Sequence, residues 1–317
     1  MNTHFISAQQ VKENLPIASL IEALSQAFAS DIETPLRQHF DIANPQSERE
    51  TTLLMMPSWQ AGKDIGIKLV TVVPESYKYD LPSIKGIYVL IDAVTGVVKA
   101  NIDAPALTAR RTAAASALAS KLLSRPDSQS LLMVGTGTLS SELIKAHCAV
   151  RPIRRVCVWG RDFAKAQAVV EQIANENLDV VAVENLANAV REVDIISCAT
   201  MSSEPLIKGE WLKPGQHLDM VGAYRPDMRE ADDHCVLQSR IVVDNKQGAL
   251  KETGDLVIPI NNQVISASAV EADLFGLCRN EVTFERASDD ITFFKSVGHA
   301  LEDLAAAQLL VKNLQEK

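Results

Sequence analysis

Two glycines follow an apolar run in the middle of the sequence. "SLLMVG" (130–135) ends at Gly135, Gly137 comes two residues later, and an amphipathic stretch then begins. In the pattern G-x-G-x-x-G, such glycines allow a tight turn and a close approach of backbone N–H groups to a pyrophosphate, which the next helix N-terminus attracts. Ser140 holds the third position and is small enough for helix and strand to pack. The stretch predicts a dinucleotide-binding loop, with an empty structural turn as the alternative.

The end of the next apolar run bears on the choice of cofactor. "RRVCVWG" (154–160) ends at Gly160 and is followed by Arg161 and Asp162. Folds that bind NAD usually place an acidic residue here to bind the adenosine ribose, whereas a guanidinium pairs with the 2′-phosphate of NADP. The residues favour NADPH, with NADH as the alternative if Asp162 holds the ribose. A solvated Arg-Asp helix start is the purely structural interpretation.

A third apolar run ends in the same way as the first. The tripeptide Met-Val-Gly recurs in "HLDMVG" (217–222), which ends at Val221 and Gly222 and is followed by Tyr224. Two apolar runs that end alike predict two walls of one crevice, with Tyr224 at its lip. We expect Thr200, which ends the run "DIISCAT", to contact the cofactor together with Val221 and Gly222.

Regular elements must hold these residues in place. From Ser130 onward, apolar runs of five or six residues alternate with amphipathic stretches. This alternation predicts an α/β fold, a Rossmann doubly wound parallel sheet with helices on both faces. We expect strands at 130–135, 154–160, 179–184, 194–200, 217–222 and 240–245, and helices at 138–150, 162–176 and 186–191. The dinucleotide-binding domain would span residues 125–287.

The rest of the chain predicts a second domain. Apolar residues at helical spacing indicate a helix pair over 7–30, with Ser7 as an N-cap and Pro16 in the first turn of the second helix. Strand-like runs follow at 51–59, 64–73 and 85–103, the last turning at 92–96, and an alanine-rich helix covers 103–124. The tail is a short strand and a long helix. It resembles this region, so we expect a split α/β domain of residues 1–124 and 288–317.

Composition limits the classes of partner. The 317 residues are 47% hydrophobic and carry a net charge of −9 without any run rich in Lys or Arg, which disfavours nucleic acid and anionic membranes as partners. The N-terminus lacks the layout of a signal peptide, and no apolar run approaches the ~18 residues of a membrane span. Five scattered cysteines and six histidines show no metal-binding spacing. We expect a soluble cytoplasmic protein without a metal.

Three longer stretches carry a resemblance to a known family. They are "GIKLVTVVPES" (66–76), "LTARRTAAASALASK" (107–121) and "FFKSVGHALEDLAAA" (293–307). Together they closely resemble the ornithine cyclodeaminase/μ-crystallin family, over nearly the whole chain. The resemblance implies a Rossmann domain plus a split α/β domain that binds substrate and forms a homodimer. Family members include ornithine cyclodeaminases, alanine dehydrogenases, μ-crystallins that bind NADPH and thyroid hormone, and ketimine reductases that convert Δ1-pyrroline-2-carboxylate to L-proline.

The resemblance also assigns roles to single residues. Arg37 and Lys68 match positions that hold the substrate carboxylate and the reacting nitrogen. Arg111 matches an arginine near the cofactor phosphates and the substrate, and Val297 matches a residue beside the substrate. Four more positions match cofactor contacts: Ser83, Thr138, Leu139 and Ser296.

The residue pattern alone gives plainer interpretations. Lys68 alternates with apolar neighbours, so it would lie on the polar face of a half-buried strand. Arg110 and Arg111 point about 100° apart on one helix, so at most one faces a site while the other is solvated. Arg37 would be an ordinary loop arginine.

The chemistry of a cyclic imine carboxylate fits these residues. Hydride adds readily to its C=N carbon only when the nitrogen is protonated or hydrogen-bonded. Arg37 can clamp the carboxylate, and Lys68 can serve the nitrogen if burial and nearby arginines lower its pKa from ~10.4 toward neutrality. By resemblance, cyclodeaminases carry an aspartate where this chain has Tyr224, whose hydroxyl donates a hydrogen bond but is a poor base. Asp227, three residues on, is not in the matching position.

These observations predict an oxidoreductase. We expect NAD(P)H-dependent reduction of cyclic ketimines, Δ1-pyrroline-2-carboxylate to L-proline, with the six-membered homologue Δ1-piperideine-2-carboxylate, which would give L-pipecolate, as a second candidate substrate. Lys68, Arg37 and Tyr224 would be catalytic, or Tyr224 would only shape the pocket. The alternatives are an NAD-dependent ornithine cyclodeaminase, a μ-crystallin-like NADPH- and ligand-binding protein, and an alanine dehydrogenase.

Overall fold

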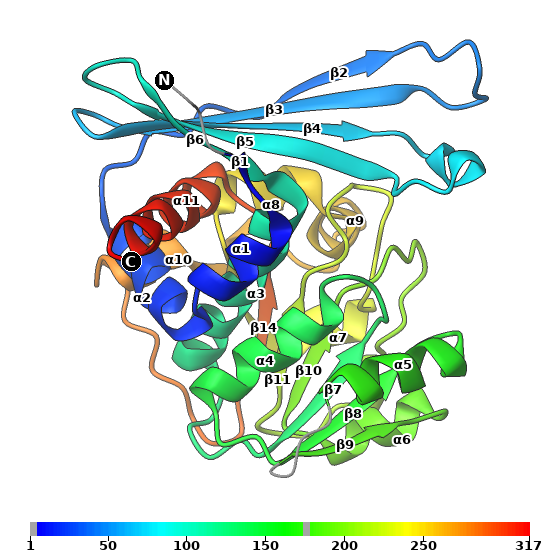
Figure 1. Cartoon of the computed structure of the whole chain (residues 1–317). Coiled ribbons are helices and arrows are strands. Elements are labelled where there is room, and N and C mark those ends of the chain that lie inside the picture. Colours follow the sequence, from blue (N-terminus) through cyan, green and yellow to red (C-terminus); the bar gives the residue numbers. More distant parts are fainter. Residues whose placement is uncertain (1–4, 174–177) are drawn as a thin grey trace. The chain divides into compact units, whose positions relative to one another are not determined.

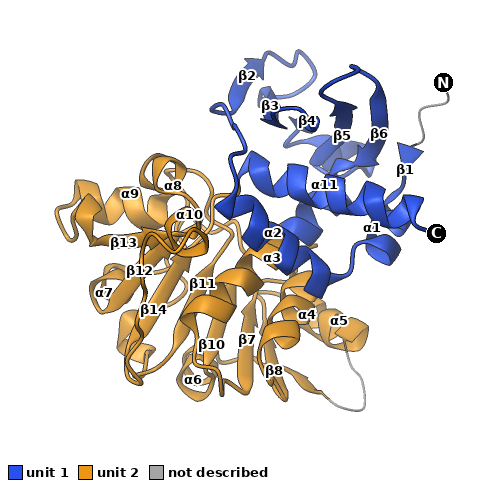
Figure 2. Ribbon diagram, turned by 90° about the vertical axis from the view of Figure 1, so that its left-hand side faces the viewer, with its two compact units in different colours: residues 1–111, 299–317 blue, residues 112–298 orange. Residues whose placement is uncertain are grey.

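The computed structural model describes residues 5–173 and 178–317, and the chain divides into two compact units (Figures 1 and 2). Unit 1 is Met1–Arg111 with His299–Lys317, and unit 2 is Thr112–Gly298. The predicted boundaries, after residues 124 and 287, differ from these for two reasons. First, unit 1 ends at Arg111, inside helix α3 (Ala104–Leu123), and not after that helix. Second, the strand β14 (Ile291–Lys295) belongs to the sheet of unit 2 and not to the N-terminal region.

Unit 1 contains a six-stranded sheet in the order β1-β6-β5-β4-β3-β2, antiparallel except for the parallel pair β1 and β6. The strands are β1 (Phe5–Ile6), β2 (Gln38–Ile42), β3 (Thr51–Gln60), β4 (Asp64–Val72), β5 (Ile84–Asp92) and β6 (Val98–Asp103). The helices are α1 (Ala8–Asn14), α2 (Ile17–Ala29), η1 (Ser76–Tyr79), the start of α3, and α11 (Ala300–Gln315). Helix α11 packs along α2 and against the central strands of the sheet (Figure 1).

Local sequence signals explain much of unit 1. Ser7 forms the predicted N-cap of α1, in a reciprocal capping box with Gln10. Pro16 precedes α2 as its N-cap and does not lie in its first turn as predicted. The predicted turn at 92–96 is confirmed, because Asp92 accepts backbone hydrogen bonds from two turn residues. Strand β2 was not predicted, since all five of its residues are exposed and show no apolar alternation.

Unit 2 contains an eight-stranded parallel sheet in the order β13-β12-β14-β11-β10-β7-β8-β9. Its strands are β7 (Ser130–Val134), β8 (Arg155–Trp159), β9 (Asp179–Ala182), β10 (Ile195–Cys198), β11 (His217–Met220), β12 (Ser239–Val243), β13 (Val270–Asp273) and β14. Counted from β7, the order β9-β8-β7-β10-β11-β14 is the 3-2-1-4-5-6 arrangement of the doubly wound dinucleotide-binding fold. The predicted Rossmann sheet is confirmed.

Helices connect these strands and cover the sheet. They are α4 (Ser140–Val150), α5 (Phe163–Ile173), α6 (Leu186–Glu192), η2 (Gly209–Trp211), α7 (Asp233–Leu237), α8 (Lys246–Glu252), α9 (Gly254–Asn261), η3 (Ala267–Ala269) and α10 (Leu274–Cys278). Helices α4, α5 and α6 match predicted ones, although the last three residues predicted for the second of these, 174–176, lie outside the described residues. The strand β14 is the short strand predicted in the tail, whereas η2, α7, α8, α9, η3, β13 and α10 were not predicted.

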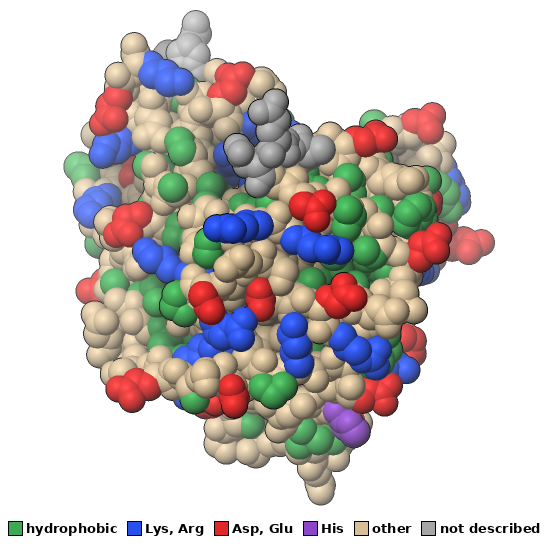
Figure 3. All heavy atoms as spheres, turned by 90° about the horizontal axis from the view of Figure 1, so that it is seen from below, with side chains coloured by type: hydrophobic (Ala, Val, Ile, Leu, Met, Phe, Trp, Pro, Cys, Tyr) green, Lys and Arg blue, Asp and Glu red, His purple; other side chains and the backbone are tan. Residues whose placement is uncertain are grey.

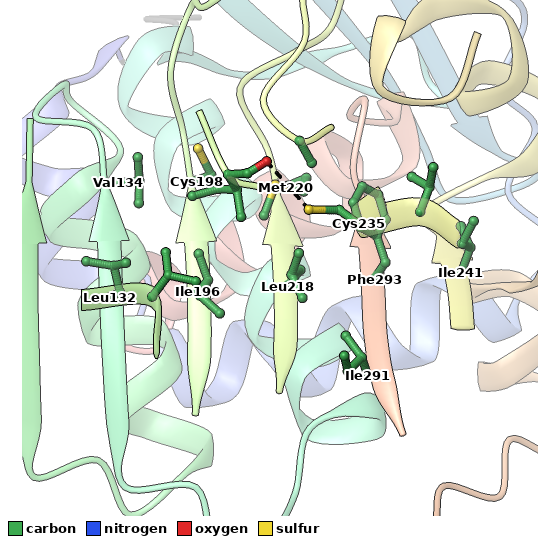
Figure 4. Close-up of a cluster of buried hydrophobic side chains, with 14 of the residues drawn as sticks. Leu132, Val134, Ile196, Cys198, Leu218, Met220, Cys235, Ile241, Ile291 and Phe293 are labelled. Atoms are coloured by element: carbon green, nitrogen blue, oxygen red, sulfur yellow. Dashed lines mark hydrogen bonds between the residues drawn. The ribbon is translucent and has the colours of Figure 1, made fainter. Parts of the chain in front are cut away.

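The core of unit 2 is built from aligned rows of strand residues (Figure 4). Leu132, Ile196, Leu218 and Phe293 are partners in register across four neighbouring strands, and none is exposed. Because parallel strands in register place such side chains on one face, they form a continuous apolar layer. This layer fixes the strand ends where polar residues and glycines follow.

The surface and composition of the described part add three facts. Lys and Arg side chains lie among Asp and Glu side chains on the face shown in Figure 3. Among the described residues, no helix is both long and apolar enough to cross a membrane. That part of the chain also brings together no group of three or more His, Cys, Asp or Glu side chains suited to a metal ion, and the five cysteines are free thiols.

Candidate functional site

Lys68 lies in the middle of β4, on the face of the sheet that α11 covers. Its cross-strand partners are Met56 and Tyr88, and all three side chains are buried, Lys68 being 3% exposed. The flanking Ile67 and Leu69 point to the other face and are half-exposed. Lys68 therefore does not belong to a solvated polar face, because the charged side chain points inward and its apolar neighbours point outward.

Four charged side chains meet around Lys68. Lys68 Nζ lies 2.6 Å from Asp303 Oδ2, and Arg111 Nε lies 3.1 Å from the other oxygen of the same carboxylate. Arg111 Nη1 also donates to Glu302 Oε2 at 2.7 Å. All four residues are buried, with Glu302 and Asp303 fully so. Two cations and two anions thus balance one another in a site that excludes water, where breaking one pair costs more than at a surface.

The electrostatics of this cluster leave Lys68 able to exchange a proton near neutral pH. Burial lowers the pKa of Lys68 to about 8; Asp303 opposes the shift, while the positive charges of Arg111 and Arg37 add to it. Burial alone would raise the pKa of the Asp303 carboxyl, but Arg111 and Lys68 hold it below its ordinary value. Asp303 therefore stays ionised and acts as a fixed counter-ion.

Glu302 and Asp303 were not predicted as site residues. They stand in the first turn of α11, where acidic residues usually serve the helix N-terminus, and Glu302 does complete a capping box with His299. A signal was available, because "ALEDLAAAQLL" is apolar on all sides of the helix and leaves the two carboxylates no solvated face. Buried carboxylates need cationic partners, and Arg111 and Lys68 provide them.

The two neighbouring arginines of α3 separate as the helix geometry predicts. Arg111 enters the cluster, whereas Arg110 Nε donates to the carbonyl oxygen of Leu15 at 3.0 Å. Arg110 is half-buried, so the prediction that the arginine outside the site would be solvated is wrong. Its role is to join α3 to the end of α1.

The other residues assigned in unit 1 lie at loops and strand ends. Arg37 is half-buried immediately before β2, and its positive charge helps to lower the pKa of Lys68. Ser83 is exposed, one residue before β5. His39, which was not assigned to the site, is exposed and lies 3.0 Å from Asp41 on the edge strand β2.

The glycine loop of unit 2 has the shape that a dinucleotide requires. Gly135 has φ +120°, and a Cβ there would lie 2.6 Å from the carbonyl oxygen of Ala199, so only glycine fits. Gly137 and Thr138 are exposed, and a Cβ on Gly137 would meet nothing within 4 Å. Helix α4 then begins after Leu139 without a side-chain cap. This uncapped helix N-terminus and the open space over Gly137 fit a bound pyrophosphate.

Two charged residues, Arg161 and Asp162, follow the end of β8. A Cβ on Gly160 would lie 2.6 Å from the methyl group of Thr136, so this glycine lets β8 end close against the loop. Asp162 Oδ1 accepts the N–H groups of Ala164 and Lys165 and caps α5. Arg161 is exposed. Oδ1 of Asp162 is thus engaged in the helix start, although Asp162, like Arg161, is exposed.

The second wall is formed by the ends of β10 and β11. Thr200 is half-buried, Val221 is buried, and Gly222 approaches Thr200 so closely that a Cβ would lie 2.0 Å from the Thr200 carbonyl oxygen. Tyr224 is half-buried in the loop that follows. Asp227 is exposed and pairs with Arg225 at 2.5 Å. It therefore does not take the place of the aspartate that, by resemblance, cyclodeaminases carry at position 224.

The last predicted segment is the turn after β14. Ser296 and Val297 are buried, and Asp244, at the end of β12, accepts the N–H groups of Val297 and Gly298 at 2.8 and 2.7 Å. Ser296 Oγ donates to the same carboxylate at 3.2 Å. This buried aspartate fixes the turn and was not predicted.

The predicted residues therefore fall into two sets. Unit 1 holds the charged set around Lys68, which can exchange a proton near neutral pH. Unit 2 holds glycines, N–H groups and small side chains at the carboxyl ends of parallel strands, the position where doubly wound folds bind nucleotides. Its members are Gly135, Gly137, Thr138, Leu139, Gly160, Arg161, Thr200, Val221, Gly222, Tyr224, Ser296 and Val297.

Comparisons with known proteins identify the family of the chain. The model of the ornithine cyclodeaminase/μ-crystallin family matches residues 1–317. The chain is 45% identical to an uncharacterized protein of Schizosaccharomyces pombe (97% of this chain and 96% of that protein) and 38% identical to Δ1-pyrroline-2-carboxylate reductase of Colwellia psychrerythraea (98% and 99%). Its structure is similar to that of Thermococcus litoralis Δ1-pyrroline-2-carboxylate reductase in complex with NADH and L-proline, with a TM-score of 0.91, 31% identity, and coverage of 98% and 97%. The chain belongs to the ornithine cyclodeaminase/μ-crystallin family.

Proposed function

We propose that this chain reduces cyclic ketimines with NAD(P)H, converting Δ1-pyrroline-2-carboxylate to L-proline and Δ1-piperideine-2-carboxylate to L-pipecolate. The observation that carries the proposal is the buried ammonium of Lys68, held 2.6 Å from Asp303 with its pKa lowered to about 8. A group with such a pKa can both hold and release a proton at neutral pH, as a general acid must. The similarity to named Δ1-pyrroline-2-carboxylate reductases over nearly the whole chain supports the same reaction.

The residues of unit 1 divide the work on the substrate. Arg37 pairs with the carboxylate of the imine, because a guanidinium forms two parallel hydrogen bonds to such a group. Lys68 donates its proton to the ring nitrogen as the C=N bond becomes a C–N bond, and it is left as a neutral amine. Asp303 holds Lys68 in place, and Arg111 holds Asp303. The proton returns to Lys68 from solvent before the next turnover.

The residues of unit 2 would hold the cofactor. The N–H groups around Gly135 and Gly137 and the start of α4 would bind the pyrophosphate, with Thr138 and Leu139 beside it. Further proposed contacts come from Ser83, Arg111, Gly160, Thr200, Val221, Gly222 and Ser296. Bound NAD(P)H supplies the hydride for the imine carbon. We propose a preference for NADPH, because Arg161 is exposed at the strand end while Asp162 caps α5.

Tyr224 favours reduction over deamination. A lyase that deaminates ornithine needs a base to move protons from water, and the tyrosine hydroxyl in the loop after β11 is a poor base. The nearest carboxylate along this loop, Asp227, is exposed and paired with Arg225. Tyr224 would instead donate a hydrogen bond to the substrate or shape its pocket, beside Val297.

We further propose that the protein is a homodimer formed through the second face of the six-stranded sheet. The face that α11 leaves uncovered is apolar across three strands, as the cross-strand pairs in register show. Its side chains, all half-exposed, are Met55, Pro57, Trp59, Ile65, Ile67, Leu69, Ile87, Val89 and Ile91. A contiguous apolar surface of this kind marks an interface, and a second copy presents the same surface.

Substrate panels separate the proposed reaction from its rivals. NADPH oxidation in the presence of either cyclic imine supports ketimine reduction. Ammonia release from ornithine without added cofactor would identify a cyclodeaminase, and ammonia-dependent reduction of pyruvate would identify an alanine dehydrogenase. Tight NADPH binding with no turnover of any of these substrates would identify a binding protein and overturn the proposal.

A further inference from the structure

Glu230 joins the two loops that follow β10 and β11. It lies between β11 and α7 and is fully buried. Its Oε1 accepts from Thr200 N at 2.7 Å and Thr200 Oγ1 at 2.8 Å. Its Oε2 accepts from Gly222 N at 2.7 Å and Ala223 N at 3.1 Å. One carboxylate therefore satisfies four donors from two different strand ends.

The two loops lie so close together that no side chain fits between them at Gly222. A Cβ on Gly222 would lie 2.2 Å from Thr200 N and 2.5 Å from Glu230 Oε1. The distance between the loops is set by the carboxylate, because both sets of donors are backbone or short side-chain groups that point at it. Any change in the length or the hydrogen-bonding capacity of residue 230 must move at least one loop.

A buried cation supports this carboxylate. Lys295 ends β14, is fully buried, and lies 3.0 Å from Asp255 Oδ2 and 3.9 Å from Glu230 Oε2. Asp255 Oδ1 in turn accepts the backbone N–H groups of Glu230 and Ala231. Burying three charged side chains is costly, and the core beside them is apolar. The position of the charges, directly behind two strand ends, indicates that they serve the loops and not the core.

The two loops belong to one half of the doubly wound sheet. The glycine loop and the end of β8 form the first half, which takes the pyrophosphate and the adenosine. Strands β10 and β11 begin the second half, across the point where the strand order reverses. A dinucleotide that spans this crevice places its second nucleotide, the nicotinamide side, against the ends of β10 and β11.

We infer that Glu230, with Lys295 as its buried counter-ion, is a positioning residue that holds the loops after β10 and β11 for the nicotinamide half of the cofactor. The inference rests on the proposed function. It predicts a selective effect: loss of the carboxylate weakens binding of the whole dinucleotide and leaves binding of its adenosine half unchanged. A residue that only stabilises the fold would not separate the two.

The test measures the dissociation constants of NADPH and of 2′-phospho-ADP-ribose, which lacks the nicotinamide, for the whole chain and for Glu230→Gln. Glutamine keeps the size but puts an NH₂ group in front of one set of donors, leaving them unsatisfied. The Kd for NADPH should rise about tenfold or more, and the Kd for 2′-phospho-ADP-ribose should stay at the wild-type value. Equal weakening of both ligands, or unchanged NADPH binding, would overturn the inference.

Two further variants keep the test decisive. Asp219→Asn is the matched control, because Asp219 is equally buried on β11 but bonds Ser197 and His147, away from the two loops. It should lower the melting temperature without changing the ratio of the two dissociation constants. If Glu230→Gln does not fold, Glu230→Asp keeps the charge beside Lys295 and reaches only one loop, and it should give the same selective loss. If the wild-type chain binds neither ligand, the proposed function is overturned as well. If the wild-type chain turns over the imine and the loss of the Glu230 carboxylate leaves both dissociation constants unchanged, this inference alone is overturned.

Discussion

Lys68 Nζ and Asp303 Oδ2 lie 2.6 Å apart although 235 residues separate them in the chain, and neither side chain is more than 4% exposed. A strand near the N-terminus and the last helix thus meet in one ion pair. Arg111 binds the second oxygen of the same carboxylate, so the pair cannot rearrange without breaking a second contact. This arrangement holds a single proton-carrying group in a fixed position, and the predictions that concern catalysis follow from it.

Lys68→Met should abolish turnover and leave NADPH binding intact. Methionine fills a similar volume but carries no proton, and loss of a general acid typically costs ~10²–10⁴-fold in rate. The rate is measured with the cyclic imine, and cofactor binding is measured by titration. Lys63→Met, at an exposed position one residue before β4, is the control and should keep normal activity. Near-normal turnover by Lys68→Met would remove Lys68 from the mechanism.

The pH dependence of imine reduction should show a descending limb near pH 8. Lys68 must carry a proton before it donates one, and its pKa is lowered from the ordinary 10.5 to about 8, so the active fraction falls as pH rises through about 8. Asp303→Asn removes the group that opposes the lowering and leaves burial and the charges of Arg111 and Arg37. The limb in the kcat/KM profile should therefore move to lower pH in that variant.

The control for this shift is Asp64→Asn. Asp64 lies on the same strand and bonds Lys99 and Gln308. It should leave the position of the limb unchanged. A limb that stays near pH 8 in Asp303→Asn, or that moves to higher pH, would contradict the assignment of Lys68 as the acid. Asp303→Asn should also lower the free energy of unfolding by ~3–5 kcal/mol, because two buried cations lose a partner.

Arg161→Ala should weaken NADPH more than NADH. In the proposed complex the guanidinium pairs with a phosphate that only NADPH carries, and a hydrogen bond to a charged group contributes about tenfold in affinity or more. Both dissociation constants are measured by titration. Arg154→Ala, at an exposed position before the start of the same strand, should change neither. Equal effects of Arg161→Ala on both cofactors would show that the 2′-phosphate is recognised elsewhere.

Ile67→Lys should convert a dimer into a monomer. Ile67 lies at the centre of the apolar face, paired with Pro57 and Val89 in register, and a lysine there would bury a charge in the interface. Light scattering coupled to size exclusion gives the mass directly. Leu237→Lys, at a position that is 56% exposed in unit 2, is the control and should remain dimeric. A wild-type mass of one chain would refute the proposed homodimer.

Much of the fold could be predicted because apolar runs of strand length alternate with amphipathic helices. That periodicity reflects burial inside a sheet with helices on both faces, and it located β7, β8, β9, β10, β11 and β12 correctly. Strand β14 was assigned to the wrong unit, because five apolar residues specify a buried strand but not the sheet that receives it. Its partners, β11 and β12, are distant in the chain.

The site was harder to predict than the fold, for a physical reason. Alternation normally puts polar residues outside, yet Lys68 points inward and Ile67 outward, because ion pairs compensate the buried charge. For Glu302 and Asp303, the apolar surroundings in the sequence of their helix indicate buried carboxylates but not the residues with which they pair. Their role depends on contacts across the chain, as does that of Glu230, which no local pattern reveals.

The most direct test of the proposed reaction follows NADPH absorbance when the purified protein is mixed with Δ1-pyrroline-2-carboxylate, with L-proline measured as the product. We predict loss of absorbance matched by an equal amount of L-proline, and no such loss with Lys68→Met. Unchanged absorbance with both cyclic imines and with both NADPH and NADH would contradict it.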